Sequence, residues 1–209
     1  MSLLMRSAMG VAWVLAALLV SGPAQAAGDA ARGKHLGYTC LGCHGIPNYR
    51  NANPSYRVPR LLGQSPEYIV AALNGYKNGD RSHSTMHAHA ASMNDQDMLD
   101  IAAYLSGNTL RSEPGRKGNA EPPKAAAVCV SCHGNDGVGI SVDYPTVAGQ
   151  YADYLERALV EYKKGGRKNA VMAGFAAQLS EADIKEIAAY YSKQTPALGT
   201  PRRKTNSIF

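Results

Sequence analysis

The sequence has little of several features that would point to other classes of protein. Runs of alternating β-branched residues, the usual sign of strands, are almost absent from its 209 residues, so we expect an all-α fold. The main apolar run, Ala8 to Val20, is shorter than the roughly 20 residues that a comfortable membrane span needs. Cysteine occurs at four positions only, and the first is Cys40, which excludes a lipid anchor on a cysteine at the end of an export signal.

The first 26 residues are typical of a secretory signal. Arg6 supplies the positive start, Ala8 to Val20 the apolar stretch, and Ala24-Gln25-Ala26 the small-residue cleavage site. We therefore expect residues 1–26 to be removed on export and the mature chain to be periplasmic. An uncleaved N-terminal membrane anchor is the alternative.

The charge balance is moderately basic. The formal net charge is +6, and removing Arg6 with the signal leaves 21 basic against 16 acidic residues, or +5. A basic excess can indicate nucleic-acid binding, but an exported chain whose sharpest basic run lies in its tail argues against it. Weak steering toward an acidic partner, or peripheral membrane association, fits better. The excess is concentrated between the two halves and in the tail, at Arg116, Lys117, Lys124 and Arg202–Lys204.

All four cysteines lie in two copies of one motif, C-x-x-C-H, at Cys40–His44 and Cys129–His133. This motif attaches a c-type haem. Two thiols three positions apart lie on one face of a helical turn and can bond to the two vinyl groups of one porphyrin edge. The following histidine is then placed under the iron as its proximal ligand. The sequence thus predicts two covalent haem c groups, held by Cys40 and Cys43 with His44, and by Cys129 and Cys132 with His133.

Two other uses of the cysteines are open. A zinc site usually brings its C-x-x-C pairs within about 15–20 residues of each other, whereas these pairs are 89 positions apart. Structural disulfides are possible in an exported chain with an even cysteine count. Neither alternative explains the histidine that follows each pair.

The chain contains an internal repeat with a constant offset of 86 residues. The haem motifs are offset by 89, so the first copy has three extra residues between its histidine and the next proline. We read this as a tandem duplication of one small haem domain, with domains at 27–107 and 125–195, a Pro- and Gly-rich linker at 108–124, and a poorly ordered basic tail at 196–209. Helices are expected at Asp29–Thr39, Glu67–Tyr76, Gln96–Leu105, Asp153–Lys164 and Glu181–Ser192, the last capped by Ser180 and Asp183. The matching segments are P-R-L-L-G-Q and P-T-V-A-G-Q from Pro59 and Pro145, Y-K-N-G-D-R and Y-K-K-G-G-R from Tyr76 and Tyr162, and I-A-A-Y from Ile101 and Ile187.

The distal ligand decides the function class, because an open haem binds small molecules and a closed one transfers electrons. Met86 and Met172 occupy the same place in the two repeats, and His/Met ligation is common in electron-transfer cytochromes c. We expect a loop to bring each methionine over its haem. Met172 has no competing methionine in the second unit. In the first, Met93 and Met98 align with apolar core positions, whereas His83, His87 and His89 are alternatives to Met86, and we expect them to be exposed loop residues.

Pro59 and Pro145 are predicted to support the proximal histidines. A ligating histidine needs an acceptor for its other ring nitrogen, which fixes the ring and tunes the iron. The carbonyl of a rigid proline loop suits this role, although each residue is also explained as an ordinary turn proline.

At these residues the chain resembles the dihaem class I cytochromes c, and in particular the cytochrome c4 family, over about residues 28 to 195. The repeated combination of C-x-x-C-H, P-x-x-x-G-Q, Y-K-x-G-x-R and a methionine before I-A-A-Y carries the resemblance. It implies two class I domains related by a pseudo-twofold axis, with haems close enough for fast electron transfer. It also implies a role between a quinol-oxidising or dehydrogenase donor and a terminal oxidase or another periplasmic redox partner.

We therefore expect an electron carrier, with no catalytic residues and no nucleic-acid partner. One alternative is a dihaem subunit of a larger respiratory complex. The other is a dihaem enzyme such as a peroxidase or a thiol-oxidising cytochrome, which needs one open haem. A methionine at the same place in both repeats argues against that enzyme.

Overall fold

The computed structural model describes residues 27–113 and 115–201. The expected export signal and the charged run Arg202–Lys204 lie outside the described residues. Within them the regular structure is helical, and strand-like pairing is limited to isolated bridges, which confirms the all-α prediction. No helix in these two ranges is long and apolar enough to cross a membrane.

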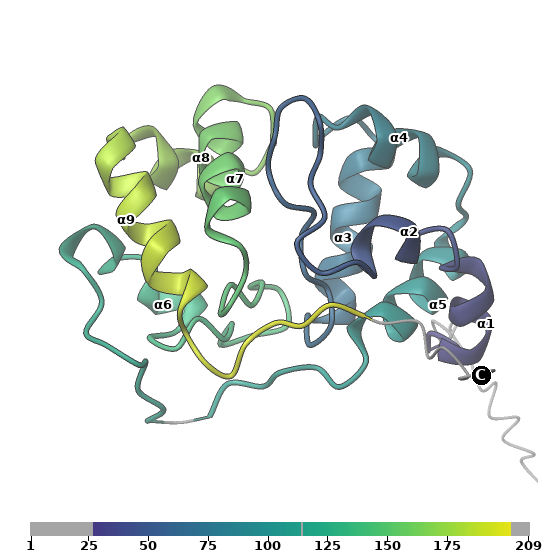
Figure 1. The fold of residues 1–209 in the computed structure, drawn as a ribbon, viewed down its shortest axis with the longest axis horizontal. Coiled ribbons are helices and arrows are strands. Elements are labelled where there is room, and N and C mark those ends of the chain that lie inside the picture. Colours follow the sequence, from purple (N-terminus) through teal and green to yellow (C-terminus); the bar gives the residue numbers. More distant parts are fainter. Residues whose placement is uncertain (1–26, 114, 202–209) are drawn as a thin grey trace, which may run out of the picture.

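The helices form two similar sets, one in each half of the molecule (Figure 1). The turn that carries each haem motif is helical in both halves, and three longer helices follow it. The duplication read from the sequence is thus visible in the fold. The first half contains α1 (Ala30–Leu36), α2 (Leu41–His44), α3 (Pro66–Lys77), α4 (Ser84–Ala91) and α5 (Asp95–Ser106); the second contains the 3₁₀ turn η1 (Lys124–Ala126), α6 (Val130–His133), α7 (Ala152–Lys164), α8 (Ala170–Ala177) and α9 (Glu181–Ser192).

Local sequence explains where the final helix of each half begins. Ser180 and Asp183 form a capping box at the start of α9, as the sequence predicts. Asn94 and Asp97 form the same box at the start of α5. These side chains satisfy backbone N–H groups that the first helical turn leaves without partners.

The methionine segments differ from the expectation. Met86 and Met172 lie on helices α4 and α8, not on loops. Each helix is only eight residues long. It is capped by a side chain three positions before the methionine: His83 accepts the N–H of Met86, and Asn169 accepts the N–H of Met172. The caps therefore fix where each methionine sits on its helix.

The first domain is built on the crossing of α1 and α5. Gly33 in α1 lies so close to α5 that a β-carbon added to it would be 1.8 Å from the carbonyl oxygen of Asp100. Only a glycine permits this approach. Behind the crossing, α5 and α3 bury one apolar cluster, made of Leu41, Ile69, Leu73, Met98, Ile101, Ala102 and Leu105.

A Gly33→Ala variant is expected to lose about 1–3 kcal/mol of unfolding free energy, because the methyl group overpacks a backbone contact that cannot relax. Chemical denaturation of the haem-loaded protein measures the change. Gly174→Ala is the matched control, since Gly174 also lies inside a helix but nothing is within 4 Å of its added β-carbon. The control should be neutral or slightly stabilising, and an equal loss in both variants would contradict this account of Gly33.

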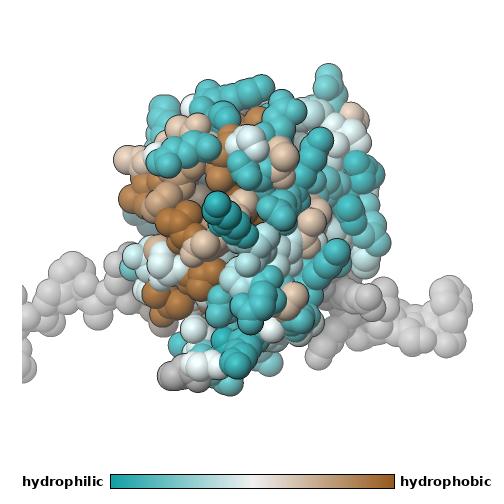
Figure 2. Space-filling model, turned by 90° about the vertical axis from the view of Figure 1, so that its left-hand side faces the viewer, coloured by the Kyte–Doolittle hydropathy of each residue, from teal (hydrophilic) through white to brown (hydrophobic). Residues whose placement is uncertain are grey.

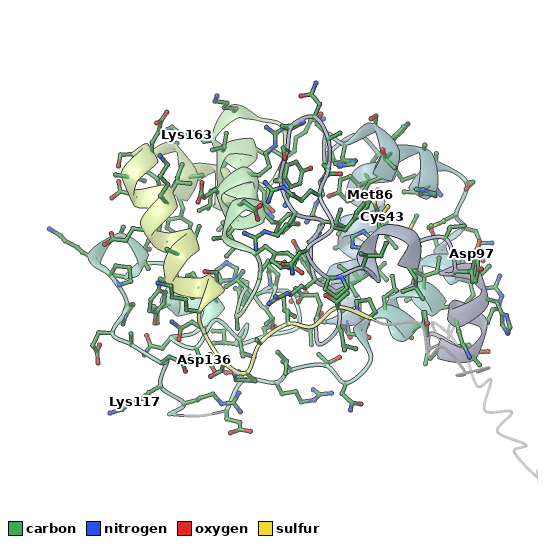
Figure 3. All side chains as sticks on the ribbon, viewed as in Figure 1. Cys43, Met86, Asp97, Lys117, Asp136 and Lys163 are labelled. Carbon is green, nitrogen blue, oxygen red and sulfur yellow. The ribbon has the colours of Figure 1, made fainter. Side chains whose placement is uncertain are left out.

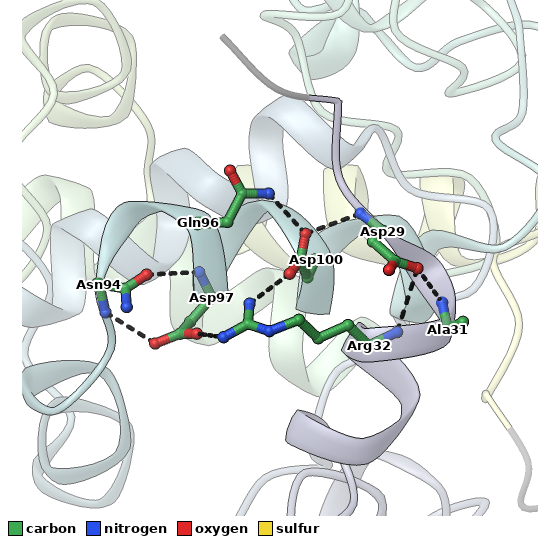
Figure 4. Close-up of polar contacts among 7 residues, drawn as sticks. All are labelled: Asp29, Ala31, Arg32, Asn94, Gln96, Asp97 and Asp100. Atoms are coloured by element: carbon green, nitrogen blue, oxygen red, sulfur yellow. Dashed lines mark hydrogen bonds and ion pairs between the residues drawn. The ribbon is translucent and has the colours of Figure 1, made fainter.

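A polar cluster locks the same crossing (Figure 4). The buried carboxylate of Asp100 accepts hydrogen bonds from the backbone N–H of Asp29 at 2.8 Å, the amide of Gln96 at 2.8 Å and the guanidinium of Arg32. The Asp29 N–H and Arg32 hold the pKa of Asp100 below its usual range. Arg32 also pairs with Asp97, so one side chain of α1 binds two carboxylates of α5.

The two domains meet along their repeated segments. Arg81 of the first domain and Arg167 of the second form an antiparallel bridge. The N–H of Ser82 donates to the carbonyl of Gly166 at 2.8 Å, and the N–H of Lys168 donates to that of Asp80 at 2.7 Å. Equivalent segments thus face each other across the interface, as a pseudo-twofold arrangement requires.

The three extra residues of the first domain belong to a loop that reaches the second domain. Figure 1 shows this loop, between α2 and α3, beside α7. The N–H of Asn48 donates to the Tyr151 hydroxyl at 2.9 Å, and Arg50 and Arg57 both pair with Asp153, at 3.2 and 3.1 Å. The insertion therefore enlarges the domain interface.

The described part of the tail, residues 196–201, is packed, and in this respect the expectation of a poorly ordered tail is wrong. The side chain of Leu198 is 2% exposed, and its N–H donates to Ala148 at 2.9 Å. Gly199 then pairs with Leu62 of the first domain through two backbone hydrogen bonds, of 2.8 and 3.0 Å. An apolar residue within a basic tail provides this anchor.

Candidate functional site

The first haem motif forms a single helical turn whose histidine is held from outside the turn. The N–H of His44 donates to the carbonyl of Cys40 at 2.8 Å, which closes the turn. Nδ1 of His44 lies 2.9 Å from the carbonyl oxygen of Pro59. Because a carbonyl only accepts, Nδ1 carries the proton and Nε2 is left with a lone pair. A proximal haem ligand needs this arrangement.

The second motif repeats the geometry. His133 closes its own turn onto Cys129 at 2.9 Å, and its Nδ1 lies 2.9 Å from the carbonyl oxygen of Pro145. Burial lowers the pKa of both imidazoles, and the bonds to the proline carbonyls offset part of that effect. The lowered pKa favours the neutral imidazole, the form that binds iron.

A cavity of the first domain has the chemistry that a covalent haem needs. The two thiols and the imidazole of the first motif lie on its wall, and Met86 lies on the wall as well (Figure 3). The rest of the wall is mainly apolar and aromatic, and part of it comes from the buried cluster of the domain. A flat apolar group fixed through the thiols would fill the space between the motif and that cluster. The cluster residues that line it are Ile69, Leu73, Ile101 and Leu105.

The distal wall holds two sulfur atoms. Met86 is half-buried and packs against the apolar cluster, as does Met93, and both line the cavity. Met98 is fully buried within the cluster, as its alignment with a core position predicts. In the second domain Met172 is also half-buried, at the same position on α8. Ligation by Met86 and Met172 stays a prediction.

The three histidines near Met86 lie on or beside α4, not on a loop. Nδ1 of His83 caps the helix, and the ring packs edge-on against Tyr76 at 6.3 Å between centroids. Nδ1 of His87 lies 2.8 Å from the carbonyl oxygen of Tyr76. His89 is exposed, yet it lines the cavity one helical turn after Met86. Of the three, His89 has the least constrained ring beside the distal position.

Sequence reasoning noted the repeated Tyr and Arg residues but assigned them no role. In the structure Arg81 lies over the ring of Tyr68 at 5.2 Å and donates to its hydroxyl at 3.3 Å. Arg167 and Tyr154 repeat this pair, at 5.4 and 3.4 Å. Both arginines lie at the domain interface, and Arg81, Tyr68 and Tyr154 line the cavity. Their constant offset of 86 residues was the available signal.

The two arginines differ in their acidic partners. Nε of Arg167 donates to Glu161 at 2.6 Å, whereas the matching position in the first domain is Gly75. Within the described residues Arg81 forms no ion pair with a carboxylate. A half-buried guanidinium beside tyrosine hydroxyls, on the wall of this cavity, suits the propionate groups of a haem. The residues present therefore fit the cofactor at its charged edge as well as at its apolar faces.

Several exposed positions around the second motif are apolar where the first domain has polar residues. Val128 beside Cys129, and Val171 and Phe175 on either side of Met172, are 47%, 62% and 39% exposed. Ile140, whose N–H donates to Cys132, is 55% exposed. Figure 2, which views the second domain, shows apolar side chains gathered on one side of this face. The first domain has polar residues at the matching positions, namely Thr39, Thr85 and His89.

The structure gives no support to the other uses of the cysteines. All four are free thiols, so no disulfide is present. The two pairs lie in different domains, and no group of three or more His, Cys, Asp or Glu side chains in the described residues is arranged to hold a metal ion. A shared zinc site is therefore excluded within these ranges.

Comparison with known proteins gives consistent matches in both halves. A family described as "Cytochrome c" matches residues 30–109, and one described as "Cytochrome C oxidase, cbb3-type, subunit III" matches residues 124–190. Cytochrome c4 of Pseudomonas aeruginosa is 31% identical over 192 residues, which cover 85% of this chain and 94% of that protein. The thiosulfate dehydrogenase electron acceptor of Stutzerimonas stutzeri is 30% identical over 200 residues, which cover 85% and 91%. The crystal structure of reduced cytochrome c4 from Pseudomonas stutzeri superposes with a TM-score of 0.61 at 29% identity and covers 80% of this chain and 100% of that one.

Proposed function

Since the chain belongs to the cytochrome c4 family, we propose that it shuttles single electrons in the periplasm between a quinol-oxidising or dehydrogenase donor and a terminal oxidase or another redox partner. It is a two-domain electron-transfer cytochrome with two covalently bound haem c groups.

One observation carries the proposal, and it recurs in both domains. A proximal histidine is fixed by a hydrogen bond, and a methionine lies on a short helix at the matching position. Each proximal histidine is fixed by a proline carbonyl at 2.9 Å, and each methionine has the same capped position on a short helix. When bound, each haem would supply an iron that accepts and releases one electron between its ferric and ferrous states. We propose His44 with Met86, and His133 with Met172, as the axial ligands. Two protein ligands leave no place for a substrate, which suits a carrier and not an enzyme.

The other residues of the cavity would bind and shield the cofactor. Cys40 and Cys43 would attach it at one edge, and the apolar cluster would exclude water from its faces. The guanidinium of Arg81 and the hydroxyl of Tyr68 would hold the charged edge. Exclusion of water suits electron transfer, because less solvent has to reorganise when the charge of the iron changes.

Electron exchange between the domains is supported by residues that lie both at the domain interface and beside the candidate haem site. Tyr154 of the second domain lines the cavity of the first, and Arg81 meets Arg167 in the interface. The arginines that would hold the charged edges of the two haems therefore lie at the same interface. We propose that this interface would serve electron exchange between the two sites, and that the motif edges would serve exchange with partners.

The partner surface is proposed at the second domain. Its motif and methionine are flanked by the exposed apolar residues Val128, Ile140, Val171 and Phe175. Aromatic and apolar side chains at the centre of a contact, with a polar rim, are typical of protein–protein interfaces. The first domain has polar residues at three of the matching positions, although Tyr38 and Ile46 beside its motif are exposed as well. The partner class is a redox protein, and the basic tail is suited to weak steering.

A second assignment of the donor is favoured by one comparison. A relative of nearly the same length is a thiosulfate dehydrogenase electron acceptor. A sulfur-oxidising dehydrogenase is therefore a candidate donor for this chain too. The match of the second half to an oxidase subunit family keeps open the role of a subunit in a larger respiratory complex. Both assignments use the same closed, electron-transferring sites.

The optical spectrum of the exported protein, with its intact mass, tests the proposal. We expect a mature chain that begins after Ala26 and carries two covalent haems. Both should be low-spin, with the weak long-wavelength band of Met–Fe(III) ligation at the strength of two haems. A redox titration should then show two reversible one-electron steps without added substrate.

Two results would contradict the carrier role. A high-spin signal in the untreated protein would indicate an open site, and peroxide turnover at that site would indicate an enzyme. A Met–Fe(III) band at half strength would instead contradict only the ligand assignment of Met86. An N-terminus that retains residues 1–26 would contradict the released periplasmic form.

A further inference from the structure

Two buried glutamines cross the domain interface and bind the backbone of the opposite domain. Gln64 and Gln150 end the repeated P-x-x-x-G-Q segments, and each is 4% exposed. Nε2 of Gln64 donates to the carbonyl of Thr146 at 2.9 Å, and Oε1 of Gln64 accepts the N–H of Thr146 at 3.0 Å. Gln150 makes the matching pair of bonds with Arg60, both at 3.0 Å.

Each side-chain oxygen is also bound within its own domain. Oε1 of Gln64 accepts the N–H of Ser65 at 3.0 Å, and Oε1 of Gln150 accepts the N–H of Tyr151 at 3.1 Å. Both lone pairs of each amide oxygen are therefore used. An amide with this many partners is held in one orientation, and its removal would leave buried backbone groups unpaired.

The peptide group that each glutamine binds is the one that holds a proximal histidine. The carbonyl of Pro145 accepts Nδ1–H of His133, and the N–H of Thr146 belongs to the same peptide unit. That N–H donates to Gln64, which belongs to the other domain. In the first domain the carbonyl of Pro59 holds His44, and the N–H of Arg60 donates to Gln150. Each histidine is thus linked through one peptide group to a glutamine of the opposite domain.

We propose that Gln64 and Gln150 are cross-domain positioning residues, each of which fixes and polarises the peptide that binds the proximal histidine of the other domain's haem. A peptide whose N–H donates a hydrogen bond is a stronger acceptor at its carbonyl. A stronger acceptor makes the imidazole a more basic ligand, which stabilises ferric iron. Gln64 therefore lowers the reduction potential of the second haem, and Gln150 lowers that of the first. This inference rests on the proposed ligation by His44 and His133.

Gln64→Leu tests the proposal, because leucine fills a similar volume without hydrogen bonds. We expect the second haem to become easier to reduce, with a change on the order of two- to fivefold in its ferric–ferrous equilibrium, while the first haem stays unchanged. An NMR-monitored redox titration separates the haems by their shifted methyl signals. The Nδ1 proton of His133 should also exchange faster with solvent. Gln150→Leu is the matched variant and should shift the first haem and the proton of His44 instead.

The haem whose potential shifts in each variant distinguishes a cross-domain role of the glutamines from a role within their own domain. A shift of the haem in the variant's own domain, an equal shift of both haems, or no shift would overturn the proposal. If Gln64→Leu assembles poorly, Gln64→Asn keeps an amide one carbon shorter and should give the same cross-domain shift. Failure of the proposed ligation would appear in the unaltered protein as missing low-spin signals, whatever the glutamine variants do.

Discussion

A Met172→Ala variant is expected to convert the second haem to a five-coordinate, high-spin form that binds carbon monoxide. Met172 is the one methionine of the second domain, and the residue one turn later on α8 is Phe175, which cannot ligate iron. The Met–Fe(III) band should fall to half its strength. The potential of that haem should also fall, because a thioether ligand raises it.

The equivalent Met86→Ala variant should behave differently. His89 lies one turn after Met86 on α4 and lines the same cavity. Residues three apart share one face of a helix, so a rotamer change can bring the imidazole toward the space that the thioether leaves. We therefore expect the first haem to remain low-spin with two histidine ligands. Its potential should fall, and carbon monoxide should bind far more slowly than to Met172→Ala.

Paired variants check this contrast. Met86→Ala/His89→Ala should give the open, high-spin haem that Met86→Ala alone does not. Met172→Ala/Phe175→His should restore a low-spin second haem, since it copies the first domain. Magnetic circular dichroism in the near infrared distinguishes His/Met from His/His pairs. A high-spin first haem in Met86→Ala would remove His89 as a substitute ligand, and an unchanged Met band would show that Met86 is not the ligand.

The features that the sequence predicted correctly depend on local spacing. C-x-x-C-H closes one helical turn in both domains, so the thiols and the histidine need no tertiary information to be recognised. The capping box at Ser180 is local as well. Because equivalent positions are 86 residues apart, a prediction made for one domain also applied to the other.

The features that it missed depend on the partner that each residue meets. The helix that bears Met86 is short and rich in histidine, and its cap is the side chain of His83, so no apolar periodicity marked it. The roles of Gln64 and Arg81 exist only where the two domains meet. Leu198 packs only because Ala148 and Leu62 lie beneath the tail. These contacts join distant segments of the chain, so the residue spacing within one repeat does not reveal them.

Loss of both thiols of the first motif is expected to unfold the first domain. In a Cys40→Ala/Cys43→Ala variant the haem is no longer attached, and the cavity that it occupies opens to water. The apolar core of this domain would then surround a hole, because Ile69, Leu73, Ile101 and Leu105 belong both to the core and to the cavity wall. Helices α2, α3, α4 and α5 all contribute residues to the cavity wall, so each would lose its contacts with the haem.

The size of the lost burial energy decides whether the first domain stays folded. Full burial of one such side chain contributes about 1.5–3 kcal/mol, so four contribute about 6–12 kcal/mol, and a cavity wall that faces water loses roughly half of that. The resulting loss of about 3–6 kcal/mol reaches the lower end of the total stability of a native protein, about 5–15 kcal/mol, and a domain of this small size lies near that end. Far-ultraviolet circular dichroism should fall, limited proteolysis should remove the first domain, and intact mass should show one haem, on the second motif. Cys43→Ala alone keeps one thioether bond and should keep the fold. A protease-resistant first domain without haem would contradict this account, since its core would then have to close on itself.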